Sequence, residues 1–292
     1  MISTATDETD DTRRWHVLQS RRQQIVTVQA VEDFRSHGIE PIVIKGVAAA
    51  RYYPEGTYRI SNDVDLAVDR SDYPKAERLV ATGAIVGPVD LHCELRHLDT
   101  VAWSDLKANS VDLEFPEGKV PVLRPEDDLR VLSVHWLTDG GSNKDRLWDI
   151  FYLVHGRDPS FDWKRCLNVV NERRRRWVEC AVGVAERYLR LDLRDTPLAA
   201  AAERLPSWLI RTVEREWAAE IKHIPLEAVV TDKTKLLAQL ARRMRPNPIY
   251  ATVDCEGSFD ARTRVFYKIR NAMHRVMPSY RRVRAALEVY RK

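Results

Sequence analysis

The spacing of apolar residues divides the chain into two parts of different character. In the first part, short apolar runs alternate with segments whose apolar residues recur at helical spacing. From about residue 126 onward the helical spacing prevails and β-rich runs become few. This change predicts an α+β half, residues 1–124, followed by an α-helical domain, residues 125–292. The helices expected in the second part cover residues 129–137, 146–154, 163–191, 208–221, 236–244 and 262–290.

Short strands and helices alternate in the first part. A long amphipathic segment predicts a leading helix over residues 12–36, which Gly38 ends. A small helix is expected from Gly46 onward, and Ser71 is expected to cap a helix over residues 72–81. The expected strands cover residues 41–44, 63–68, about 91–98 and about 110–115, with a turn at 116–118 and a connection at 121–125.

Composition and charge narrow the class of protein. Of the 292 residues, 44% are apolar and 31% are charged, which is typical of soluble globular proteins. The four cysteines form no CxxC pair, and neither a bilayer-spanning apolar run nor a signal peptide is evident, so we expect a cytoplasmic protein with reduced thiols. The net charge of +4 creates no global basic field, although the C-terminal tail is basic.

Two acids one residue apart are the strongest chemical signal in the chain. Asp63 and Asp65 stand at the start of an apolar, β-prone run. Because side chains alternate along a strand, both carboxylates project from the same face. Like charges held this close repel each other unless a cation lies between them, and oxygen ligands of this kind suit Mg²⁺. The pair therefore predicts a site for metal-dependent phosphoryl or nucleotidyl transfer.

Residues before the acid pair support a role in phosphate binding. Lys45 and Gly46 follow the expected strand over residues 41–44, at the start of a helix. Glycine lets the backbone approach a ligand closely, exposed amides at a helix start attract phosphate, and lysine adds a point charge. Arg59 and Ser61 precede Asp63 and are also expected to contact phosphate oxygens.

A third carboxylate is expected on the strand over residues 110–115. In Val111-Asp112-Leu113-Glu114-Phe115, acids again alternate with apolar residues. Two-metal chemistry uses two acids to bridge the ions and a third to bind one ion and help deprotonate the attacking hydroxyl. We assign this third role to Asp112 and keep Glu114 as the alternative.

These residues resemble the uncharacterised nucleotidyltransferase family of the polymerase-beta-like superfamily. The resemblance implies an α+β fold, with a nucleotidyltransferase-type mixed β-sheet core, flanking helices and a following α-helical domain. It also implies a bound nucleoside triphosphate (NTP) and Mg²⁺, with two ions expected. The implied roles are phosphate binding by Lys45 and Gly46, metal binding by Asp63 and Asp65, and the third acid at Asp112. The motifs that carry the resemblance are Lys45-Gly46, Tyr53-Pro54, Arg59 and Ser61-Asn62-Asp63-Val64-Asp65-Leu66, and more weakly His135-Trp136, Trp148-Asp149-Ile150 and the basic tail.

The acceptor of the nucleotide has no recognisable motif. We expect transfer of a nucleoside monophosphate to a hydroxyl or phosphate, with release of pyrophosphate, in a small-molecule or peptide tailoring reaction. Because the C-terminal tail is basic, one alternative is a nucleotidyltransferase that modifies RNA or protein, as a toxin-like enzyme would. A non-catalytic nucleotide-binding protein is a further alternative. The base of the NTP and the oligomeric state stay open.

Further polar residues near the predicted site have simpler explanations. His92, Glu94 and His97 do not share one strand face, so we expect surface polar residues, with substrate contact by one of them as the alternative. Ion pairing within a helix is enough to explain Lys144, Arg146 and Asp149, although substrate contact is again the alternative.

Overall fold

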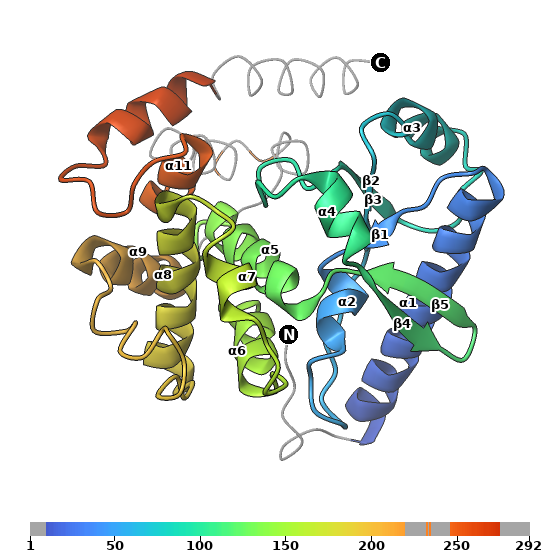
Figure 1. The fold of residues 1–292 in the computed structure, drawn as a ribbon, viewed down its shortest axis with the longest axis horizontal. Coiled ribbons are helices and arrows are strands. Elements are labelled where there is room, and N and C mark those ends of the chain that lie inside the picture. Colours follow the sequence, from blue (N-terminus) through green and yellow to red (C-terminus); the bar gives the residue numbers. More distant parts are fainter. Residues whose placement is uncertain (1–9, 220–231, 233, 235–245, 275–292) are drawn as a thin grey trace. The chain divides into compact units, whose positions relative to one another are not determined.

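The computed structural model describes residues 10–219, 232, 234 and 246–274 (Figure 1). Its internal contacts divide the chain into two units, unit 1 with residues 1–135 and 145–203 and unit 2 with residues 136–144 and 204–292. The β-sheet lies in unit 1, together with several of the helices that follow it in sequence. The predicted division into separate domains between residues 124 and 125 stays a prediction.

A mixed five-stranded sheet forms the centre of unit 1, in the order β3-β2-β1-β5-β4 (Figure 1). β2 pairs in parallel with β3, β1 pairs antiparallel with β2 and parallel with β5, and β4 and β5 form an antiparallel pair. The strands are β1 (Ile42–Val43), β2 (Val64–Val68), β3 (Val89–Cys93), β4 (Val111–Phe115) and β5 (Gly118–Val122). The predicted class, a mixed sheet with flanking helices and a C-terminal helical region, is confirmed.

Helix α1 (Asp10–Ser36) packs its apolar side against this sheet (Figure 1). Val31 and Phe34 are fully buried there, in the same cluster as Leu66 of β2 and Val122 of β5. Burial of an apolar side chain of this size contributes about 1.5–3 kcal/mol, so this cluster is a main source of stability in unit 1. Three shorter helices also accompany the sheet, namely α2 (Gly46–Ala50), α3 (Tyr73–Ala81) and α4 (Trp103–Ala108).

The helices after the sheet begin at side-chain caps where the sequence offers them. Asp162 accepts hydrogen bonds from two backbone amides at the start of α7, and Asn171 accepts one at the start of α8. These two caps divide the single helix predicted over residues 163–191 into two. The four helices are α5 (Pro125–Thr138), α6 (Leu147–His155), α7 (Trp163–Leu167) and α8 (Glu172–Leu189).

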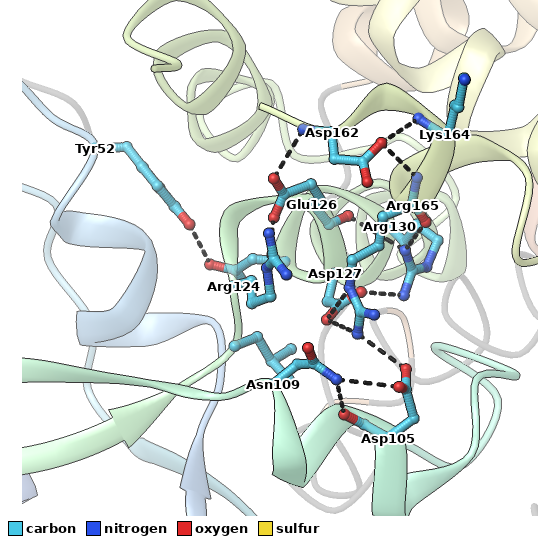
Figure 2. Close-up of polar contacts among 12 residues, drawn as sticks. Tyr52, Asp105, Asn109, Arg124, Glu126, Asp127, Arg130, Asp162, Lys164 and Arg165 are labelled. Atoms are coloured by element: carbon cyan, nitrogen blue, oxygen red, sulfur yellow. Dashed lines mark hydrogen bonds and ion pairs between the residues drawn. The ribbon is translucent and has the colours of Figure 1, made fainter. Parts of the chain in front are cut away.

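A network of ion pairs, buried except at Asp105, joins α4, α5 and α7 within unit 1 (Figure 2). Asp127 is its centre, because it accepts hydrogen bonds from Arg130 at 2.6 Å and from Arg165 at 2.7 Å. Arg165 also donates to Asp105 on α4 at 2.9 Å, and Arg130 donates to Asp99 at 2.9 Å. Since breaking a buried pair leaves an uncompensated charge, this network holds the helices in one arrangement.

Unit 2 contains α9 (Ser207–Ala218), α11 (Pro248–Asp254) and helical residues 265–274. Asn247 caps α11 through its side-chain oxygen and donates from its side-chain nitrogen to the backbone oxygen of Gly140 at 2.9 Å. The predicted helix over residues 236–244 and the part of the predicted 262–290 helix after residue 274 lie outside the described residues.

Two strands differ from their predicted ranges. β3 ends at Cys93 rather than near residue 98, because Glu94 and Arg96 adopt φ values of 51° and 48°, which a strand does not accommodate. The prolines at 121 and 125 predict a connection, yet Pro121 lies within β5, opposite Asp112 of β4. In the described part of the chain, no helix combines the length and apolar character needed to cross a membrane.

Candidate active site

The site is built on the turn that leads from β1 into α2. Ile44 donates a backbone hydrogen bond to Asp65 at 3.0 Å, which ties this turn to β2. Lys45 has φ 53° and ψ −135°, an unusual conformation for a residue with a side chain, and Gly46 follows with φ 28°. Lys45 is only 5% exposed, so its ammonium is directed into the protein.

Two acids and a histidine converge from neighbouring strands. In the parallel pairing of β2 with β3, Asp65 lies opposite Asp90 and Ala67 lies opposite His92. Side chains at i and i+2 of a strand share a face, so Asp90 and His92 point to the same side of the sheet. The ligand atoms of Asp65, Asp90 and His92 all lie within 4.8 Å of one another. We call these three residues the acid cluster.

Hydrogen bonds within the acid cluster stabilise charge. His92 Nε2 lies 3.1 Å from Asp90 Oδ2 and 3.6 Å from Asp65 Oδ1. The hydrogen bond with His92 lowers the pKa of Asp90 to about 2. Burial alone opposes charge on His92, but its hydrogen bonds with Asp65 and Asp90 raise the pKa of the imidazole above 6.5. Asp90 is therefore ionised at neutral pH.

Lys45 completes this cluster with a positive charge. Its Nζ lies 2.5 Å from Asp65 Oδ1, 3.2 Å from His92 Nε2 and 4.0 Å from Asp90 Oδ2. The carboxylate of Asp65 is itself buried, with 9% of its side chain exposed. A buried carboxylate is costly unless it is paired, so Lys45 supplies the counter-charge.

Most of the predicted site residues meet around Gly46. A β-carbon on Gly46 would lie 3.5 Å from Asp65 Oδ2, 3.6 Å from Ser61 Oγ and 3.8 Å from the backbone oxygen of Asp63. Asp63 lies just before β2 and is exposed, and its carboxylate accepts a hydrogen bond from Ser61 Oγ at 3.0 Å. The structure thus brings Lys45, Gly46, Ser61, Asp63 and Asp65 into one region.

The predicted phosphate ligand Arg59 is engaged with a helix instead. Its Nε donates to Asp149 Oδ1 at 2.7 Å and its NH2 group donates to Asp149 Oδ2 at 3.0 Å, a bidentate pair with α6. Tyr53 donates to the same carboxylate at 2.7 Å. Although burial opposes it, Asp149 raises the pKa of Arg59. The segment that carries Ser61 is therefore anchored to α6 on its N-terminal side.

His135 of α5 adds a neutral group near these charges. Arg146 NH1 lies 3.1 Å from its ring nitrogens, and because arginine only donates, the histidine nitrogen accepts. Burial, followed by the positive charges of Lys45, Arg146 and Arg59, holds the pKa of His135 well below 6.5. Helices α5 and α6 thus contribute polar groups next to the acid cluster.

The predicted third acid, Asp112, lies elsewhere in the sheet. It is on β4, which pairs with β5 at the end of the described sheet, so that β1 and β5 separate it from β2. Glu114, the alternative, forms an exposed ion pair with Lys119 of β5. Neither acid is brought to Asp65. The carboxylate that the fold places beside Asp65 is Asp90, which the predicted strand over residues 91–98 did not include.

The sequence does contain a signal for Asp90 and His92. In Val89-Asp90-Leu91-His92, polar and apolar residues alternate in the same way as in Asp63-Val64-Asp65-Leu66. The donors suit a divalent cation, because carboxylate oxygens are ligands for Mg²⁺ or Mn²⁺ and imidazole binds transition metals. The acid cluster already surrounds one cationic group, the Lys45 ammonium, which shows that its geometry fits a positive charge.

A mixed sheet with paired acids beside a Lys-Gly turn defines a protein of the nucleotidyltransferase type. The chain belongs to the uncharacterised nucleotidyltransferase family, whose sequence profile matches residues 6–190, and the predicted family is thereby confirmed. Among solved structures, it is similar to an antigenic nucleotidyltransferase-like protein from Paracoccidioides brasiliensis, with 17% identity and a TM-score of 0.42 over 63% of this chain and 92% of that chain. No curated protein matches the chain.

Proposed function

We propose that the protein is a metal-dependent nucleotidyltransferase that transfers a nucleoside monophosphate from an NTP to an acceptor. The observation that carries the proposal is the acid cluster: Asp65, Asp90 and His92 present ligand atoms within 4.8 Å of one another, in a chain of a nucleotidyltransferase family. In the reaction, an acceptor oxygen forms a bond to the α-phosphorus while the bond to the bridging oxygen breaks. Pyrophosphate leaves, and the acceptor proton passes to solvent.

We assign Mg²⁺ binding to Asp65 and Asp90 of the acid cluster, and also to Asp63, whose carboxylate accepts a hydrogen bond from Ser61. When bound, the ion supplies Lewis-acid stabilisation of charge on the phosphate oxygens. Asp90 takes the role that the sequence alone assigned to Asp112, because it is the acid next to Asp65. His92, hydrogen-bonded to Asp90, fixes the orientation of that carboxylate.

Around the acids, the chain offers groups for phosphate. Ser61 Oγ lies beside the Gly46 backbone and is proposed to donate to a phosphate oxygen. Lys45 is proposed to contribute its charge to the same phosphates. Arg59 is proposed to act mainly as a positioning residue, since two of its nitrogens already bind Asp149. Its positive charge still adds to the local potential that favours an anionic ligand.

For the acceptor, we propose a small molecule or a peptide that carries a hydroxyl or phosphate. The small net charge of +4 supports this choice over a large polyanion, because nucleic-acid binding proteins commonly carry a strongly basic face. Most of the basic residues of the C-terminal tail lie outside the described residues, so transfer to RNA or to a protein is left as an outcome of the test.

Calorimetry of NTP binding with and without Mg²⁺ tests the proposal. The wild-type chain should bind an NTP only with the metal, and Asp65→Asn and Asp90→Asn should lose that binding. Asp112→Asn is the matched control, because it removes an acid from the same sheet, and it should bind as the wild type does. Equal binding by wild type and Asp65→Asn would refute the proposal. Loss in Asp112→Asn but not in Asp90→Asn would restore Asp112 as the third acid.

A second experiment identifies the acceptor. The chain is incubated with each NTP labelled at the α-phosphate, together with a metabolite extract, a peptide pool or total RNA. Label in the low-molecular-weight or peptide fraction supports the proposed acceptor class. Label on RNA or on intact protein would overturn it in favour of a macromolecular acceptor. The Asp65→Asn variant gives the background in each reaction.

A further inference from the structure

The ammonium of Lys45 contacts the same three side chains that could together hold a metal ion. Its three nearest polar partners, at 2.5, 3.2 and 4.0 Å, are Asp65 Oδ1, His92 Nε2 and Asp90 Oδ2. These residues are the same three that form the acid cluster. Only 6% of the Lys45 side chain is exposed, so water screens this interaction poorly. The ammonium thus already offsets part of the negative charge of the two carboxylates.

The backbone of Lys45 is strained in order to place the ammonium there. A φ of 53° with ψ of −135° is a conformation that glycine adopts easily and other residues adopt at a cost of about 1–3 kcal/mol. The surrounding backbone holds it, because Ile44 donates to Asp65 and Ala49 donates to the Lys45 carbonyl at 2.7 Å. Strain of this kind concentrates at functional sites.

A divalent cation and the ammonium exclude each other at this place. Mg²⁺ approaches a carboxylate oxygen to about 2.0–2.1 Å, and one of the two Asp65 oxygens, Oδ1, already lies 2.5 Å from Lys45 Nζ. Two positive charges this close to the buried Asp65 carboxylate repel each other, although water reaches the cluster at Asp90, whose side chain is 54% exposed. An ion held between Asp65 Oδ1 and Asp90 therefore requires the lysine to leave. Its four-carbon stem has the rotamer freedom to do so.

We propose that Lys45 is an exchangeable counter-ion, which offsets negative charge in the acid cluster until a divalent cation displaces it and which then binds a phosphate of the nucleotide. The inference rests on the proposed function and adds to it a coupling between the binding of the metal ion and the binding of the nucleotide. Because the ion must displace the lysine, it binds weakly alone. Once a nucleotide receives the displaced ammonium, ion and nucleotide strengthen each other's binding, and this coupling is reciprocal.

Mn²⁺ binding without nucleotide, followed by electron paramagnetic resonance, tests the proposal. Lys45→Gln keeps the β-carbon and its strained backbone but removes the charge, so Mn²⁺ should bind about tenfold more tightly or better than in the wild type. Lys45→Arg retains a positive charge and should bind Mn²⁺ as weakly as the wild type. Lys119→Gln is the matched control, since this exposed lysine pairs with Glu114 away from the cluster.

The affinity for the nucleotide should change in the opposite direction to the affinity for the metal. At saturating Mn²⁺, Lys45→Gln should bind the NTP about tenfold more weakly, because the phosphate loses its ammonium partner. An increase in metal affinity together with a decrease in nucleotide affinity separates this role from simple damage to the site, which weakens both. If Lys45→Gln binds Mn²⁺ no more tightly than the wild type, the proposal is overturned.

A measurement on the wild-type protein keeps the test valid if the variant does not fold. Acetylation of Lys45 by a mild reagent, read by mass spectrometry, should rise when Mn²⁺ is added, while acetylation of Lys119 stays constant. Unchanged acetylation of Lys45 would overturn the proposal. If Mn²⁺ displaces Lys45 but no NTP binds, the counter-ion role of Lys45 stands and the proposed nucleotidyltransferase function fails. If an NTP binds with Mn²⁺ but the acetylation of Lys45 does not change, the proposed function stands and the counter-ion role fails.

Discussion

Replacement of Asp149 by alanine tests whether the contact between α6 and the segment before β2 supports both stability and the site. Asp149 is buried, with 4% of its side chain exposed, and it accepts two hydrogen bonds from Arg59 and one from Tyr53. Asp149→Ala removes all three interactions at once. It leaves the Arg59 guanidinium, itself 10% exposed, as a buried charge without this partner.

The expected cost follows from this burial. Breaking a buried ion pair by removing one partner costs about 3–5 kcal/mol, because the remaining charge stays desolvated. The hydroxyl of Tyr53 loses its acceptor as well, but the two losses overlap and do not simply add. We therefore expect the free energy of unfolding to fall by about 3–5 kcal/mol, much of the total stability of an ordinary domain.

Urea unfolding followed by circular dichroism measures this change. Arg59→Met/Asp149→Leu is the informative companion, since it removes both charges and should recover most of the lost stability. Asp192→Ala is the matched control, because its ion pair with Arg194 at 2.6 Å lies on the surface, with 55% of the Asp192 side chain exposed. This substitution should leave the urea midpoint unchanged. Hydrogen exchange should also be faster over residues 53–62 in Asp149→Ala.

Asp149→Ala that is no less stable than Asp192→Ala would contradict the predicted cost of the unpaired charge. A double variant as unstable as the single one would contradict it as well, because the loss would then not come from an unpaired buried charge. If stability falls as expected but NTP binding is unaffected, Arg59 and Asp149 support the fold without positioning Ser61.

Three further predictions concern pH, backbone and thiols. Burial raises the pKa of Asp128 from 3.8 to about 6, so its protonated form contributes stability that is complete below about pH 4 and lost as the pH rises through 6. Asp128→Asn should therefore gain up to about 3 kcal/mol relative to the wild type between pH 4 and pH 7 in urea unfolding, and a loss would contradict this sign. Gly87→Ala should be less stable than Gly38→Ala by about 1–3 kcal/mol in the same assay. Both glycines have positive φ, but only at Gly87 would the new methyl group lie 2.5 Å from a side-chain atom, Val26 Cγ1. Equal losses of stability in the two variants would show that this clash relaxes. Cys93 and Cys255 are half-buried, whereas Cys166 and Cys180 are buried. A thiol reagent should therefore react in native protein only with Cys93 and Cys255. Reaction of Cys166 or Cys180 without unfolding would contradict their burial.

Local sequence patterns predicted most of the elements in unit 1. The alternation in 63–68 and the helical spacing in 12–36 correspond to β2 and α1. In α1 one buried face imposes its period on the sequence. All five residues of β2 are buried, so there the alternation separates its acid, Asp65, from the apolar residues beside it. Local patterns fail where a special backbone intervenes. The positive φ values of Glu94 and Arg96 end β3, and neither residue type announces such a conformation.

Some residues of the candidate site were also predictable from local patterns, whereas others were not. Lys45, Gly46 and Asp65 were found from residue type and spacing, since their contacts depend on one turn and one strand. Asp112 and Asp90 are both acids on alternating strands, so the sequence alone did not distinguish them. Strand order did, because β3 pairs with β2 whereas β4 pairs with β5 at the other side of β1.

Residue types and their spacing already limit the chemistry of the site, because acids, lysine and glycine at short spacing are local features that the period of a strand converts into a shared face. Strand pairing and helix packing then select Asp90 as the acid beside Asp65, engage Arg59 with Asp149, and bring the Lys45 ammonium among the acids. A local pattern does not predict these contacts, because they join residues far apart in the chain. Their formation depends on strand pairing and helix packing, which the whole hydrophobic core selects.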